Sequence, residues 1–497
     1  FWVTATTASL VSIYAIVQHF GFDPFLSSPE PALRAYGSFG NPIFLGSYLV
    51  LSLPLTIALI LIYRDKMEAS LHIWIGAAMI SLQVMALVFS LSRGPWVGAL
   101  VGAGSFLVLG LWIWGIKAMV RPLLILLVAF GVAYLGTLLP VSGGDASQVI
   151  GERVGSIGRD VTGGLNNRLT IWSTSQDVFF DIPWVDTERY PEIPELSARA
   201  LRPLVGYGPD MFQFVYPLVG ESTYTFELAS HGHNFAIHTL IELGLLGVIA
   251  YGALALSVGA LLFRMLRVAK SGSYPYWVAA LLVGLAAAFA GRLVEQIPGK
   301  AQIADLTLAW MLAALVAVLA SNSFTQIDPP STAKRAGNNT RVSAQSQRMS
   351  FSPIRVITVA VAGLLILVLW TQIVVDPVRA SFASMQAKSD PSVQSSIERH
   401  RKAVSINPAS VVSQLALAET LFKGVALSPD EQEQIAWLNE AQSVAENIIA
   451  RNPLDHRAWS RIAEYTRELG ANGIIDKQES TYGAEVLAGL MPGFYQA

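Results

Sequence analysis

Residues capable of acid–base chemistry gather between positions 231 and 242. His231 and His233 flank a glycine, Asn234 follows directly, and His238 and Glu242 lie further along an apolar stretch. Because a neutral imidazole at the boundary of water and lipid can act as a general base near pH 7, we assign that role to His233. A helix would place His238 and Glu242 on one face. Glu242 could then hold a catalytic network together, or the pair could be a buried hydrogen bond that locks the helices.

Arginines form the second set of candidate residues. Arg93, Arg168, Arg202 and Arg292 lie at or between the ends of apolar stretches. The planar guanidinium group suits phosphate, and two or more such groups can clamp a diphosphate. A single arginine of this kind is more often a cation that reaches out to lipid headgroups. Arg93, Arg168 and Arg292 taken together favour a bound anionic ligand.

The composition excludes a soluble protein. The chain has 497 residues, of which 14% are charged and 53% hydrophobic, whereas soluble domains carry about 25% charged residues. The mean hydropathy is +0.48. The net charge of −2 leaves no basic surface for nucleic acid, and the absence of cysteine excludes disulfides, thiolate metal sites and a cysteine nucleophile. We therefore expect a polytopic membrane protein with an all-helical fold.

Apolar stretches of about 20 residues are long enough to span a bilayer. Nine stretches qualify or nearly qualify: 2–20, 42–63, 71–91, 95–116, 121–139, 234–263, 275–293, 302–320 and 354–375. Four of the polar connectors between them are basic and fall on one side of the predicted membrane, which the positive-inside rule assigns to the cytoplasm. The loop 140–233 and the tail 376–497 then both face outward.

The chain is predicted to consist of a membrane core and an exported tail. The core covers 1–320, residues 321–353 form a flexible cytoplasmic linker, and 354–375 form the last span. In the tail, helical patterns over 394–404, 409–424, 431–451 and 455–469 are interrupted by Asn-Pro or Ser-Pro. The motif AVSINP at 403–408 is echoed at 448–453 and 486–492, as in a degenerate tetratricopeptide-like array. Such a tail is either a simple helical bundle or a surface for a protein partner or glycan.

Several segments together resemble the O-antigen ligase (Wzy_C) superfamily. His233 and Asn234, followed after nine residues by Gly244 and then by Gly247, match its H-[N/S/Q]-x9-G-x-x-G signature. Three further segments are similar to motifs of that family in the same order: Gly37–Pro42 (GSFGNP), Ser90–Gly94 (SLSRG), and Asn167–Trp172 (NRLTIW) with Gly206–Phe212 (GYGPDMF). The resemblance covers about residues 10–320. It departs at Ile43, where the family usually has asparagine, and it implies that further spans precede this chain in a longer protein.

The resemblance implies a membrane glycosyltransferase with a GT-C-like fold, without a cofactor and without a metal. Such an enzyme transfers a glycan from undecaprenyl diphosphate to an acceptor at the outer face of the bacterial cytoplasmic membrane, with inversion. We expect His233 to be the base and Arg168 and Arg93 to stabilise the leaving diphosphate. Substrate-binding roles are expected for the following residues: Arg292, Asn234, Tyr207, Glu242 and Arg202.

The acceptor remains open among a glycan, a lipid and a protein, so a ligase, a glycan polymerase and a protein O-oligosaccharyltransferase are all compatible with the motifs. Two other classes compete with the enzyme. A polysaccharide transporter would place charges at the bilayer midplane and repeat its spans internally. A membrane-tethered scaffold working through its repeat tail would leave the His-Asn motif unexplained.

Overall fold

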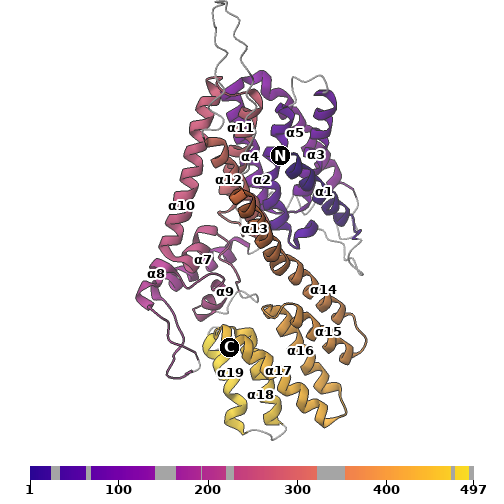
Figure 1. Cartoon of the computed structure of the whole chain (residues 1–497), viewed down its shortest axis with the longest axis vertical. Helices are drawn as coiled ribbons and strands as arrows, with labels where there is room; N and C mark the ends of the chain where they lie inside the picture. The colour runs from indigo at the N-terminus through magenta and orange to yellow at the C-terminus, as the bar shows by residue number, and fades with distance from the viewer. Residues whose placement is uncertain are drawn as a thin grey trace, which may run out of the picture. The chain divides into compact units, whose positions relative to one another are not determined.

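A computed structural model describes residues 1–23, 34–62, 69–139, 164–191, 193–219, 229–321, 353–471 and 476–491. Within these ranges all regular structure is helical, which confirms the predicted all-helical class (Figure 1). The chain divides into two compact units. Unit 1 comprises Phe1–Ile182, Ala198–Gln213 and Thr225–Pro329, and unit 2 comprises Pro183–Ser197, Phe214–Tyr224 and Pro330–Ala497. The predicted linker, 321–353, lies almost entirely outside the described residues.

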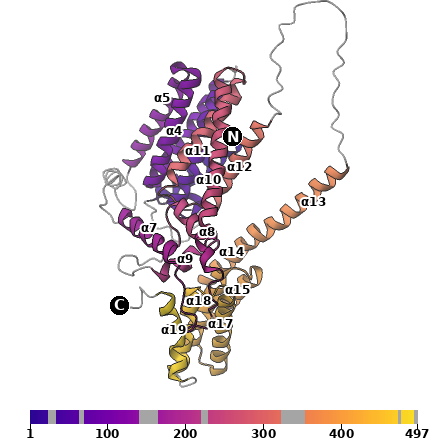
Figure 2. The same ribbon diagram turned by 90° about the vertical axis from the view of Figure 1, so that its left-hand side faces the viewer.

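Unit 1 contains a bundle of long apolar helices. Among the described residues, eight helices of the chain are long and apolar enough to cross a membrane, as in a multi-pass membrane protein. Seven of these candidate spans belong to unit 1, and Figure 2 shows α10, α11 and α12 side by side within it. The long helices of unit 1 are α1 (Trp2–His19), α2 (Pro42–Ile62), α3 (Ala69–Phe89), α4 (Arg93–Trp114), α5 (Ile116–Thr137), α10 (Phe235–Lys270), α11 (Tyr276–Glu295) and α12 (Ile303–Ala320).

Three predicted spans correspond to helices that differ from the prediction in their ends or in their hydropathy. The first stretch, 2–20, forms α1 but is not among the eight, because buried polar residues such as Ser9, Ser12 and Gln18 dilute its apolar character. The predicted polar connector before residue 121 shrinks to Gly115, whose φ of 76° separates α4 from α5. The predicted span 354–375 is helical over its whole length, and the candidate span identified by length and hydropathy is Gly363–Lys388. There α13 (Pro353–Trp370) continues through a π-helical turn, Thr371–Val375, into α14 (Asp376–Lys388).

Short helices lie at the end of the bundle where α10 begins. They are α7 (Gly164–Asp181), the 3-10 turn η2 (Arg199–Leu201) and α8 (Arg202–Val205), and α9 (Phe212–Val215) starts in unit 1. Figure 1 shows α7 and α8 beside the N-terminal part of α10, with which both are in contact. A further 3-10 turn, η1 (Gly37–Phe39), precedes α2. The region 140–233, predicted only as a polar loop, is therefore partly helical.

Glycines allow α4 and α11 to pack closely. A Cβ on Gly98 would lie 2.7 Å from the Cβ of Glu295, and one on Gly291 would lie 2.6 Å from the carbonyl oxygen of Gly98. Contacts of this kind bring helix backbones together in a membrane, where lipid supplies no hydrophobic drive for association. The same contact fixes the C-terminal end of α11, which carries Arg292 and Glu295.

Unit 2 contains a series of helix hairpins. After α14 come α15 (Val393–Ile406), α16 (Val411–Leu427), α17 (Glu431–Arg451), α18 (His456–Ala471) and α19 (Lys477–Leu490), and each packs against its neighbours in the chain. The four predicted helices of the tail are thus present with small changes of their ends. Two further helices extend this series, α14 at its start and α19 at its end.

The two Asn-Pro turns of the tail are stabilised in the same way. The side chain of Gln414 donates to the carbonyl oxygen of Pro408, and the indole of Trp459 donates to that of Pro453. In both cases the donor stands six residues after the proline. This shared geometry supports the internal repeat read from the sequence. The third echo ends at Pro492, outside the described residues.

Unit 2 also includes pieces of the chain between α5 and α10. The hydroxyl of Tyr190 donates to the carbonyl oxygen of Glu485 at 3.0 Å, and its ring fills the space where Gly489 has no side chain. The ring of Phe214 lies 6.1 Å from that of His456, with the Arg457 guanidinium 5.4 Å from its centroid. Segments on both sides of 198–213 therefore fold with the tail.

We predict that Gly98→Ala destabilises unit 1, because the new methyl group forces α4 and α11 apart. The expected loss is about 1–3 kcal/mol, the usual range for overpacking. The measurement is the thermal midpoint of the detergent-solubilised chain, followed by tryptophan fluorescence. Gly104→Ala on the same helix is the matched control, because a Cβ there meets nothing within 4 Å. Equal midpoints for the two variants would contradict close packing at Gly98.

Candidate functional site

His233 stands at the start of α10 in a strained backbone conformation. Its φ is 46°, in the left-handed region that residues with a side chain rarely adopt. Its N–H donates to Nδ1 of His231 at 2.9 Å, which holds the turn. Asn234 is the N-cap of α10, and its side-chain oxygen accepts from the N–H groups of Ala236 and Ile237. The family-like pair His233-Asn234 is thus a helix start that projects an imidazole from a fixed, strained position.

His231 is a structural partner that the sequence analysis did not assign. Its ring stacks on that of His238 with centroids 3.7 Å apart, and its side chain is buried. Burial lowers the pKa of His231 to about 2, with smaller effects from nearby His238, Lys300 and His233. The ring is therefore neutral at physiological pH. In the neutral ring, Nδ1 of His231 has a lone pair that accepts the backbone N–H of His233.

Glu242 connects α10 to the segment before α9. One of its carboxylate oxygens accepts the backbone N–H of Phe212 at 3.3 Å, and the other lies 3.4 Å from Nε2 of His238. The expected His238–Glu242 contact on one helical face is therefore present. It links the histidines to the Gly206–Phe212 segment, which is consistent with Glu242 as the holder of a network.

Two glycines form a backbone crossing between α10 and the segment after α8. Gly244 has φ 65° and ψ −169°, and Gly206 has φ 73° and ψ −174°, a region open only to glycine. A Cβ on Gly244 would lie 2.3 Å from the carbonyl of Leu204, and one on Gly206 would lie 2.3 Å from that of Glu242. The first glycine of the family-like spacing after His233 is thus required by contact with another segment.

The break in α10 exposes carbonyl groups that the crossing segment then uses. The N–H of Tyr207 donates to the carbonyl of Ile241 at 3.0 Å, and that of Gly208 donates to Glu242 at 2.9 Å. In an uninterrupted helix these carbonyls would accept from residues four positions later. Tyr207 is held by its backbone, and its hydroxyl reaches the carbonyl of Val178 on α7 at 3.5 Å. Arg202 donates to the carbonyl of Gly206 at 3.1 Å and so closes the same loop.

Arg168 is brought to His233 by α7. The indole N–H of Trp172 donates to the carbonyl of Gly232 at 2.9 Å, which ties α7 to the turn. Arg168 lies one helical turn before Trp172 and so shares its face. Burial lowers the pKa of Arg168, and the charge of nearby Arg93 lowers it further. Two arginines far apart in the sequence are therefore neighbours.

The electrostatic environment of His233 is positive. Burial, together with the smaller effects of the Arg168 and Lys300 charges, lowers the pKa of His233 to about 4. The imidazole is therefore neutral at pH 7, the state that a general base needs. Arg93, at the first position of α4, follows a turn that Arg34 braces through the Ser90 carbonyl and the Ser92 hydroxyl.

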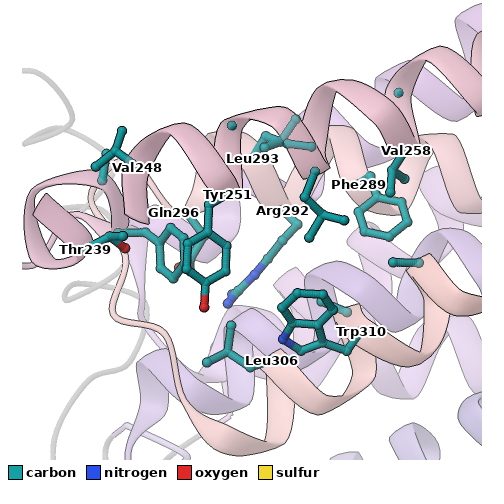
Figure 3. Close-up of a pocket in the computed structure, with 18 of the residues that line it drawn as sticks. Thr239, Val248, Tyr251, Val258, Phe289, Arg292, Leu293, Gln296, Leu306 and Trp310 are labelled. Carbon is teal, nitrogen blue, oxygen red and sulfur yellow. The ribbon is translucent and has the colours of Figure 1, made fainter. Parts of the chain in front are cut away.

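Arg292 has different partners from Arg168 and Lys300. It is 5% exposed and forms ion pairs with Glu295 and Asp305, which are 0% and 1% exposed. It also lines an apolar cavity of about 370 Å³ between α10, α11 and α12. Figure 3 shows its guanidinium pointing between Tyr251, Leu306 and Trp310. Two carboxylates already balance its charge.

The described residues contain no group of three or more His, Asp or Glu side chains placed to hold a metal ion. No model of a known protein family matches the sequence, and no curated protein is significantly similar to it. The resemblance to the O-antigen ligases therefore rests on its motifs. Those motifs are His233-Asn234 with Gly244 and Gly247, and the segments Gly37–Pro42, Ser90–Gly94, Asn167–Trp172 and Gly206–Phe212.

We predict that Gly244→Ala disrupts the crossing. Alanine cannot adopt this backbone conformation at low cost, and its methyl group would collide with the Leu204 carbonyl, so we expect a loss of more than about 2 kcal/mol. Hydrogen exchange of residues 204–212 should accelerate, because the N–H groups of Tyr207 and Gly208 lose their acceptors. Gly252→Ala, on the same helix and with open space around it, should leave exchange unchanged. Slow exchange in both variants would refute the crossing.

Proposed function

We propose that this chain transfers a glycan from undecaprenyl diphosphate to an acceptor hydroxyl, by a metal-independent inverting reaction like that of the O-antigen ligases. The observation that carries the proposal is the position of His233 in a strained turn, to which Trp172 of α7 and Lys300 are hydrogen-bonded. Arg168 and Lys300 are close enough to contribute to the lowered pKa of its imidazole. A base beside cations suits a reaction in which a hydroxyl loses a proton while a diphosphate leaves.

The reaction assigned to these residues is a single displacement. The acceptor oxygen attacks the anomeric carbon, its proton passes to a ring nitrogen of His233, and the bond from that carbon to the phosphate oxygen breaks. The electron pair leaves with undecaprenyl diphosphate, whose growing negative charge Arg168 and Arg93 stabilise. Asn234, Glu242, Tyr207 and Arg202 serve by fixing the turn and the crossing loop, as their contacts indicate.

The apolar cavity beside α10 supports a lipid-linked substrate. It is lined by Phe235, Ala236 and Thr239, in the first turns after His233, and continues along α10 to Leu262. An isoprenoid chain cannot leave the bilayer without exposing a large apolar surface to water. In this proposal the isoprenoid of the donor lies along the cavity. The ion pairs of Arg292 hold α11 and α12 together where they line it.

The set of segments that fold together in unit 2 supports the proposed topology in the bacterial cytoplasmic membrane. Pieces of the loop after α5 fold together with the tail, for example Tyr190 with Glu485. A bilayer cannot separate residues that share a hydrogen bond, so loop and tail belong on one side. The connector charges assign that side to the outside. The tetratricopeptide-like tail would then meet an acceptor or a protein partner there.

We predict that His233→Ala abolishes transfer, because the acceptor proton has no base. The assay is glycoconjugate formation by the purified chain with undecaprenyl-diphosphate glycan and an acceptor extract, and the rate should fall at least about 100-fold. His72→Ala is the matched control. His72 lies near the start of α3, at the end of that helix away from Arg93, and its ring contacts Trp2. Wild-type turnover in His233→Ala would eliminate this base assignment.

We predict that Arg168→Lys lowers the rate about 10- to 1000-fold while the protein stays folded, because an ammonium group cannot reproduce the two-pronged contact of a guanidinium. The measurement is kcat for glycan transfer, with the thermal midpoint as a check on folding. Arg199→Lys, in η2 of the same loop and bonded to the Ile182 carbonyl, should retain activity. Full activity in Arg168→Lys would show that charge alone suffices.

A further inference from the structure

Lys300 connects three segments around the candidate site. Its ammonium donates to the hydroxyl of Ser230 at 3.2 Å, directly before His231, and lies 5.9 Å from the ring centroid of Phe44. Phe44 is in the first turn of α2, immediately after the family-like Gly37–Pro42 segment. Lys300 thus brings the start of α2 to the histidine turn.

The turn that carries Lys300 is braced from both sides. Glu295 is fully buried and accepts from the Ser47 hydroxyl, the Gln296 amide and Arg292, each at 2.7 Å. The carbonyl of Gln296 in turn accepts the N–H of Phe235. A Cβ on Gly299 would lie 2.5 Å from the carbonyl oxygen of Glu295, so only glycine fits before Lys300. The position of the ammonium group is therefore set by the bundle.

Charges from separate elements meet at this point. Lys300 and Arg168 both act on His233, the first from the turn between α11 and α12 and the second from α7. Burial lowers the pKa of Lys300, and the carboxylate of Asp210 nearby raises it. Asp210 is exposed at the loop surface. The partly buried ammonium is thus a cation beside His233, and among the described residues the solvated carboxylate of Asp210 acts on it.

We propose that Lys300 binds the diphosphate of the lipid-linked donor together with Arg168. A diphosphate carries two charged phosphate groups, and cations on two separate elements can each take one. The inference rests on the proposed function, because it assumes a diphosphate donor. It adds a residue that the His-Asn and arginine motifs do not contain.

Binding of the donor would also change the base. In the free site, burial lowers the pKa of His233, and the charges of Arg168 and Lys300 add to that effect. The negative charges of a bound diphosphate offset both cations, so the imidazole binds a proton more readily once the donor is present. His233 would therefore be a stronger base in the loaded enzyme than in the free enzyme.

The test compares binding of undecaprenyl diphosphate and undecaprenol to the full chain in nanodiscs. Lys300→Gln and Lys300→Met should each weaken binding of the diphosphate lipid about tenfold or more and leave undecaprenol binding unchanged. Methionine keeps the apolar stem over Phe44 if the glutamine variant does not fold. Lys270→Gln is the matched control, because that ammonium also lies over an aromatic ring, 4.5 Å from the Trp112 centroid.

A pH profile separates electrostatics from folding. Removal of the positive charge raises the pKa of His233 in the free enzyme, so the acidic limb of kcat/KM should move to higher pH in Lys300→Met and stay in place in Lys300→Arg and Lys270→Gln. If wild-type chain binds both lipids equally, the diphosphate donor is wrong and the proposed function fails. Suppose instead that the wild-type chain prefers the diphosphate lipid. If Lys300→Met then binds that lipid as tightly as wild type and has its acidic limb of kcat/KM at the same pH, only the Lys300 assignment is overturned.

Discussion

The interruption of α10 at Gly244 is the constraint on which the candidate site depends. A continuous helix would use the carbonyl groups of Ile241 and Glu242 internally and would leave no place for the Gly206–Phe212 segment. The two glycines, Gly206 and Gly244, let the backbones touch, and the freed carbonyls then bind that segment. Through Glu242 and Phe212 the same contact reaches the histidines. The helix, the crossing segment and His238 are thereby connected through Glu242.

The site and the membrane interior treat charge in opposite ways. Within the bundle, Arg292 is nearly inaccessible and is balanced by Glu295 and Asp305, as the cost of an unpaired buried ion requires. Around His233, in contrast, burial and the charge of Arg93 lower the pKa of Arg168, and burial and the charges of Arg168 and Lys300 lower the pKa of His233. An arrangement that disfavours its own charges in the empty state gains most when an anion arrives. This contrast supports anion binding at the end of the bundle rather than at its centre.

Much of the architecture follows from local patterns in the chain. Long apolar runs predict the spans, and Asn-Pro dipeptides predict the turns of the tail, because both signals act within one or two helical turns. Local patterns say less about where helices end. The predicted connector before residue 121 lies inside α5, and α1, one of the nine predicted spans, is less apolar than the eight candidate spans because it contains polar residues such as Gln18. Helix ends also depend on packing partners, which a periodic pattern does not specify.

For the site, the residue types alone determined the candidate chemistry: a histidine next to a helix-capping asparagine, arginines suited to phosphate, and glycines at a set spacing. The tertiary structure decided which of them meet. Arg168 and Lys300 reach His233 because Trp172 anchors α7 to the Gly232 carbonyl and Gln296 anchors the α11–α12 turn to Phe235. Arg292, equally attractive as a residue type, is instead engaged by Glu295 and Asp305. The reason is that electrostatic partners are set by distances of a few ångströms between segments far apart in the chain, and only folding fixes those distances.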